Sequence, residues 1–114
     1  MKHYMKLNPD PFRAIKSGQK IYELRLFDEK RRLVAPGDVI EFTNTETGEI
    51  LSRTVRALHL FDTFEALYAA IPLERCGYTR EEAASASASD MDEYYTPQQQ
   101  AKFGTVAIEL EPIL

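Results

Sequence analysis

The sequence Gly18-Gln19-Lys20-Ile21-Tyr22-Glu23-Leu24-Arg25 is the stretch of this chain that says most about its fold. The residues before it have the pattern of a short amphipathic helix, with Asp10 as the N-cap and Pro11 at the first helical position. The glycine that opens the stretch is placed for a left-handed helix cap. Alternation over residues 21–27 then predicts a strand. The stretch therefore joins a helix to a strand through a tight turn.

The predicted strand has two chemically different faces. Tyr22, Leu24 and Leu26 share one face, whereas Glu23 and Arg25 lie on the other. We expect the leucine face to pack in the core of the domain and the charged face to line a solvated cleft. On that expectation, Leu24→Ala costs roughly 2–5 kcal/mol of stability. Glu23→Ala costs about 1 kcal/mol or less.

The rest of the chain continues the mixture of strands and helices. A Pro-Gly-Asp turn at 36–38 precedes a predicted strand over 39–43, and a polar loop leads to a longer strand over 50–59. Capping patterns predict helices that begin after Asp62, Thr79 and Thr96. A final alternating strand is expected over 105–110. The sequence predicts one α+β domain over residues 1–114, a small mixed β-barrel with helices packed at its ends.

The charge of the chain is distributed unevenly. The formal net charge is −4, but residues 1–34 carry nine Lys and Arg against four Asp and Glu, a balance of +5. The remaining 80 residues carry five against fourteen, a balance of −9. An acidic body with one basic segment can still present a face to nucleic acid, although a solvated charge run is the simpler interpretation of composition alone.

The turn and strand bring together a small set of charged groups. Glu23 and Arg25 project from one strand face, and the turn can aim Lys20 at the same point. Two cations and one carboxylate can hold a phosphate or a polar base edge, with the carboxylate orienting the cations. The alternative is a surface lysine beside an Arg–Glu strand pair that contributes little.

This pattern, Gly-x-Lys-x-x-Glu-x-Arg, resembles the hallmark motif of the ASCH domain family, and Gly18, Lys20, Glu23 and Arg25 match it position by position. The turn at 36–38 and the closing strand extend the resemblance over most of the chain. The family is similar in fold to PUA domains. The resemblance implies that the four motif residues line a ligand-binding cleft for RNA or a nucleotide-like molecule, in RNA metabolism or translation.

The resemblance also leaves two other functions open. Some relatives are hydrolases of modified nucleosides or RNA, which would make Lys20 and Glu23 catalytic here. The acetylcytidine-hydrolysing branch has a Thr where this chain has Glu23, and a more distant acid, for which Glu65 or Glu74 would serve. The missing hydroxyl argues against that covalent route. The second alternative is a protein-interaction domain.

Further side chains extend the predicted site. Arg31 and Arg32, in the charged segment after the strand, are candidate phosphate contacts at the edge of the cleft. Tyr94 and Tyr95 could stack on a base, although packing explains such a pair equally well.

Other reactive residues favour structural roles. Cys76 has no neighbouring histidine and is expected to be a buried thiol. His3 and His59 lack carboxylates at metal-site spacing, and the acidic run 90–93 suits a helix N-terminus, so we predict no metal and no cofactor. The N-terminus lacks a signal-peptide pattern and no stretch has the length of a membrane span, so a cytoplasmic location is expected.

Overall fold

The computed structural model describes residues 1–112, apart from the side chains of residues 92 and 93. Its strands are β1 (Lys2–Leu7), β2 (Tyr22–Leu26), β3 (Val39–Asn44), β4 (Ile50–Phe61) and β5 (Thr105–Leu110). Its α-helices are α1 (Pro9–Ser17), α2 (Phe64–Ala70), α3 (Arg80–Ser85) and α4 (Pro97–Phe103). Short 3-10 helices lie at Arg31–Leu33, Leu73–Cys76 and Ala88–Glu93.

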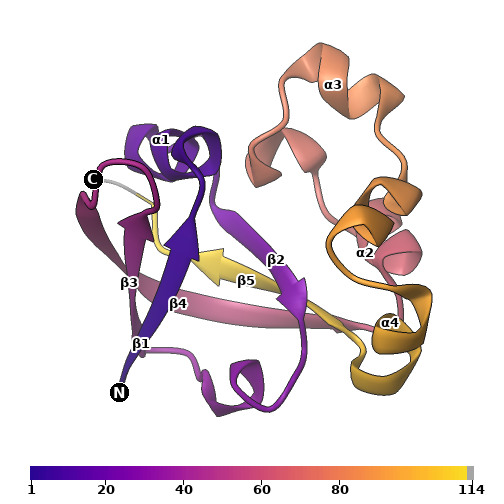
Figure 1. Ribbon diagram of the computed structural model, residues 1–114, viewed down its shortest axis with the longest axis horizontal. Coiled ribbons are helices and arrows are strands. Elements are labelled where there is room, and N and C mark those ends of the chain that lie inside the picture. The colour runs from indigo at the N-terminus through magenta and orange to yellow at the C-terminus, as the bar shows by residue number, and fades with distance from the viewer. Residues whose placement is uncertain (113–114) are drawn as a thin grey trace.

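The strands form one mixed sheet in the order β1-β3-β4-β5-β2 (Figure 1). β1 pairs with β3 in parallel, and the other neighbours are antiparallel. The sheet curves into a half-barrel whose two outer strands, β1 and β2, share no backbone ladder. The predicted α+β barrel fold is confirmed, and its open seam lies between these two edges.

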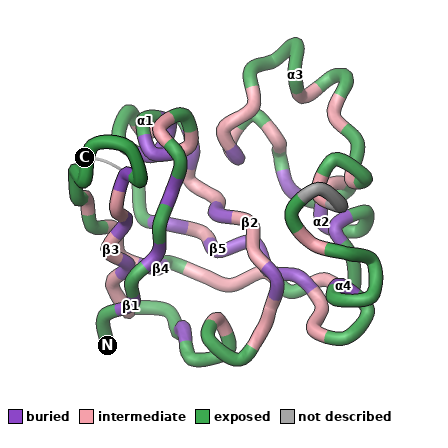
Figure 2. The backbone as a smooth tube through the Cα atoms, viewed as in Figure 1, coloured by how far each residue is buried: buried purple, intermediate pink, exposed green. Residues whose placement is uncertain are grey.

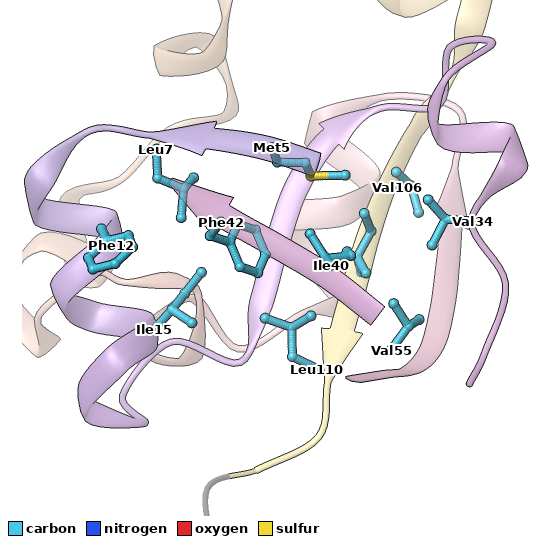
Figure 3. Close-up of a cluster of buried hydrophobic side chains, with 11 residues drawn as sticks. Met5, Leu7, Phe12, Ile15, Val34, Ile40, Phe42, Val55, Val106 and Leu110 are labelled. Atoms are coloured by element: carbon cyan, nitrogen blue, oxygen red, sulfur yellow. The ribbon is translucent and has the colours of Figure 1, made fainter. Parts of the chain in front are cut away.

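Two hydrophobic clusters lie on opposite faces of the sheet, and β5 contributes to both. Val106, Ile108 and Leu110 join the interior of the half-barrel with α1 (Figure 3). Ala107 faces the other way and packs with α2 residues Phe64 and Leu67. Helices α2, α3 and α4 gather beside the β2 edge, and α3 is almost wholly exposed there (Figure 2).

The leucine face of β2 packs in a hydrophobic core cluster, as predicted, and this cluster is the one shared with the helices. Leu26 is buried in the cluster with α2, and Leu24 is only partly buried against it. Glu23 lies opposite Ile108 in the β2–β5 register and is 2 % exposed. The charged face is therefore mostly buried, and the solvated environment that we predicted for Glu23 is wrong.

Several predicted element ends shift by one or two residues. α1 begins after Asn8 rather than Asp10, because Pro9 fits the first helical position as well as Pro11 does. The N-cap of α2 is Thr63 rather than Asp62, and its hydroxyl accepts from the backbone N–H of Ala66. The predicted boxes at Thr79 and Thr96 are present.

The predicted turn at 36–38 ties β3 to the start of the chain. The Asp38 carboxylate bonds to His3 Nε2 at 2.8 Å, accepts from the Ala35 backbone N–H at 3.0 Å, and pairs with the Met1 amine at 3.1 Å. His3 first, then the Ala35 N–H, hold the pKa of Asp38 down at about 2. The contact fixes the register of β1 beside β3.

We expect the stabilising effect of Asp38 to depend on pH. Because its folded pKa lies below its usual value near 4, its contribution is present above about pH 4 and is lost as pH falls toward 2. Urea unfolding at pH 7, 4 and 2.5 should show the wild type more stable than Asp38→Asn, by a margin that shrinks with acidity. A margin independent of pH would contradict this.

Candidate functional site

The four motif residues meet where α1 ends and β2 begins. Gly18 closes α1 in the left-handed region, with φ of 89°, and donates its N–H to Ile15. The turn is fixed at its end by Lys20, whose backbone N–H bonds to the Ala14 carbonyl at 3.0 Å. The next residue, Ile21, donates to the Arg75 carbonyl at 2.8 Å. These bonds direct the Lys20 side chain back over β2.

Glu23 accepts from two cations. One of its carboxylate oxygens lies 2.7 Å from Lys20 Nζ, and the other lies 2.8 Å from a terminal nitrogen of Arg25. The side chains of Glu23 and Lys20 are 3 % and 9 % exposed, and that of Arg25 is 16 % exposed. The three residues form a buried ion triad with one excess positive charge.

Contacts within the triad shift the pKa values of Glu23 and Arg25. Burial alone would raise the pKa of Glu23, but Lys20 and Arg25 overcome it, so the pKa lies below its usual value. Burial opposes the charge of Arg25 as well, and Glu23, with a smaller contribution from Tyr95, raises the pKa of Arg25. The two cations therefore hold Glu23 in its carboxylate form.

Arg25 also spans the open seam of the half-barrel. While its Nε donates to Glu23 at 3.0 Å, a terminal nitrogen donates to the backbone carbonyl of Lys6 at 3.1 Å. This bond links β2 to β1, the two strands that lack a common ladder. The hydrogen bond from the motif arginine thus takes the place of part of the backbone pairing that would close the barrel.

The triad forms the floor of a cleft of about 700 Å³. Lys6 and the residues that begin α1 line one side, and Leu24, Met91, Tyr94 and Tyr95 line the other. Tyr94 is 66 % exposed, so its ring is available at the rim.

Among the described residues that line the cleft, four have cationic side chains and three have acidic ones. The cations are Lys6, Arg13, Lys20 and Arg25, and the acids are Asp10, Glu23 and Glu46. Arg13 and Asp10 pair with each other on α1, whereas Lys6 makes no ion pair among the described residues. The described lining therefore has a modest positive excess, which suits an anionic ligand.

The structure places the two other predicted arginines differently. Arg31 pairs with Asp28 at 3.1 Å and borders a smaller hollow that adjoins the cleft. Arg32 donates to the Phe103 carbonyl at 3.2 Å, and its guanidinium lies over the Phe27 ring. Arg32 is thus outside the cleft, because the chain turns away from the motif after β2.

The remaining candidates also lie outside the cleft. Glu65 and Glu74 are exposed and line neither the cleft nor its neighbouring hollows. His3 bonds to Asp38, and His59 bonds to Glu109 at 2.8 Å. In the part of the chain that the structure describes, no three His, Cys, Asp or Glu side chains gather as a metal site. Of the predicted acidic run 90–93, the side chains of residues 92 and 93 lie outside the description.

Cys76 and Gly77 lie beside the stem of Lys20. Burial raises the pKa of the Cys76 thiol to about 12, in keeping with a structural thiol. A Cβ at Gly77, whose φ is 99°, would lie 3.3 Å from Cδ of Lys20. Gly77 therefore allows the lysine stem to pack closely. Sequence analysis did not identify this role, because its only local signal is a glycine that follows a predicted buried cysteine.

The sequence predicted that Leu24→Ala destabilises the fold more than Glu23→Ala does. Because the triad is buried, we expect the opposite order. Glu23→Ala leaves two desolvated cations unpaired and should lower the free energy of unfolding by about 3–5 kcal/mol. Leu24→Ala should cost less, because Leu24 is only partly buried. Urea unfolding of both variants tests the order.

A strand carboxylate with an exposed partner provides the matched control. Glu41 pairs with Lys2 at 2.9 Å, and the Lys2 side chain is 49 % exposed. Glu41→Ala should cost about 1 kcal/mol or less. If Glu23→Ala is no more destabilising than Glu41→Ala, the triad does not stabilise the fold.

The sequence matches the family model of the ASCH domain over residues 5–114. Hypothetical protein PH0355 is 34% identical, with a TM-score of 0.81, covering 99% of this chain and 100% of that one. Protein PF0455 from Pyrococcus furiosus is also 34% identical, with a TM-score of 0.71 and coverage of 99% and 98%. The ASCH protein from Zymomonas mobilis shares the fold at 16% identity, with a TM-score of 0.66 and coverage of 96% and 66%.

A comparison with curated proteins finds no match. Among the described residues, none of the helices combines the length and the apolar character needed to cross a bilayer.

Proposed function

The chain belongs to the ASCH domain family, whose fold is generally like that of RNA-binding domains, and we propose that its cleft binds RNA or a nucleotide-like ligand. The observation that carries the proposal is the floor of the cleft, where two nearly buried cations share one carboxylate. The excess charge is poorly screened there and attracts a phosphate.

Each motif residue has a distinct part in this proposal. Gly18 makes the turn that positions Lys20. Glu23 orients both cations, and its single negative charge leaves one positive charge of the pair uncompensated. Lys20 and Arg25 then provide N–H donors and charge for a phosphate at the floor of the cleft. Because Glu23 is buried, we assign it to positioning rather than to direct ligand contact.

The opposite wall suits the base of such a ligand. Leu24, Met91 and the exposed ring of Tyr94 supply an apolar and aromatic surface beside the charged floor. Aromatic side chains accept any base by stacking, which gives affinity with little sequence preference. The combination of a cationic floor and an aromatic wall favours a nucleotide over a simple anion.

The geometry supports binding better than hydrolysis. A carboxylate held by two cations is a weak base, because its pKa is lowered. The described lining of the cleft contains no Ser, Thr, Cys or His, and its only hydroxyls are the phenols of Tyr94 and Tyr95. The described lining therefore offers no aliphatic hydroxyl, thiol or imidazole as a nucleophile.

We expect Tyr94→Ala to weaken the binding of single-stranded RNA and of a nucleoside monophosphate by about tenfold, the loss of one base stack. Fluorescence anisotropy for a labelled uridine hexamer and NMR titration with uridine monophosphate measure the two affinities at low salt. Leu60→Ala is the matched control, since Leu60 is 57 % exposed and borders a different hollow.

A second variant tests the floor of the cleft. Changing both Lys20 and Arg25 to Ala should abolish binding of both ligands, and circular dichroism must show that the variant still folds. Absence of binding by the wild type at low salt would overturn the proposal. So would wild-type affinity in Tyr94→Ala.

A further inference from the structure

We propose that a second, basic groove beside the cleft holds an adjacent nucleotide, so that the natural ligand is a single strand of RNA rather than a mononucleotide. The inference rests on the proposed function of the cleft. The groove is a hollow of about 360 Å³ at the open seam of the half-barrel. Its lining includes Tyr4, Lys6, Arg25, Lys30 and Arg31.

The groove and the cleft are continuous at the seam. Lys6 and Arg25 border both hollows, one from β1 and the other from β2. The bond from Arg25 to the Lys6 carbonyl, at 3.1 Å, lies between the two hollows. A ligand that rests on the triad can therefore extend over this contact without leaving a cationic surface.

The groove is more strongly basic than the cleft. Among the described residues, its lining has four cations, on Lys6, Arg25, Lys30 and Arg31, and no acidic side chain. Lys30 is exposed and forms no ion pair with a described residue. A phosphodiester backbone has one negative charge per nucleotide, so successive phosphates of one strand can lie in the two hollows.

Arg31 retains unused hydrogen-bond donors at this position. Its one ion pair joins a terminal nitrogen to Asp28 at 3.1 Å. Its Nε is buried and has no hydrogen-bond partner among the described residues. The buried Nε is out of a ligand's reach, but Asp28 fixes the guanidinium, and no hydrogen bond to a described residue uses its other terminal nitrogen, which can donate to a phosphate.

An aromatic ring completes the groove. Tyr4 is 58 % exposed on β1 and lies outside the hydrophobic clusters. Its neighbour in the register, Glu41, is paired with Lys2 at 2.9 Å and so adds little repulsion. An exposed tyrosine among cations has the composition of a base-stacking platform for single-stranded nucleic acid.

The experiment compares a labelled uridine hexamer with uridine monophosphate on the whole chain. Tyr4→Ala should reduce hexamer affinity by about tenfold, the loss of one stack. Lys30→Glu should reduce the slope of log K against log salt for the hexamer by about 0.7 or more, the value for one phosphate contact. Lys102→Glu, the same charge change on exposed α4, is the control and should leave the slope unchanged.

The outcomes separate this inference from the proposed function. If both ligands bind the wild type, and neither Tyr4→Ala nor Lys30→Glu alters hexamer binding beyond Lys102→Glu, the groove is overturned while the cleft stands. If the hexamer binds the wild type no more tightly than the monophosphate, the groove is likewise overturned. If neither ligand binds, both proposals fall.

Discussion

The carboxylate of Glu23, buried between Lys20 and Arg25, is the contact on which both the fold and the candidate site depend. A buried ion pair seldom stabilises more than an apolar replacement would, because desolvation offsets the attraction. Removing one partner is different, since it leaves an uncompensated charge inside the protein. Here the carboxylate also orients an arginine that joins the sheet's two free edges, at 3.1 Å from the Lys6 carbonyl.

The same contact explains why the buried residues and the cleft-lining residues of β2 are not separated onto its two faces. We expected the leucine face to form the core and the charged face to serve the ligand. In the structure Leu24 lines the cleft and Glu23 is buried, so each face contributes to both. The cations are held by a structural partner and still face a hollow. A ligand of the proposed kind would meet side chains that are already ordered, which lowers the entropy cost of its binding.

Local sequence signals predicted much of the fold and the composition of the triad. The capping boxes at Thr79 and Thr96, the cap at Gly18 and the alternation of the final strand all reflect interactions within a few residues. The orientation of β2 could not be predicted. Alternation distinguishes two faces of the strand, but it does not show which face packs in the half-barrel and which packs against the helices. Here the second layer is a helical cluster encoded some forty residues later.

Tertiary placement explains the rest of what the sequence could not show. Lys6 and Tyr4 belong to β1, and only the parallel pairing with β3 brings that strand to the seam beside Arg25. Arg31 and Arg32 are adjacent in sequence, yet one turns toward the seam and the other packs on Phe27. The +5 charge balance of residues 1–34 therefore does not by itself locate a basic surface, because the half-barrel determines where each of these charges lies. Its open edge gathers some of these charges on one surface and directs others away.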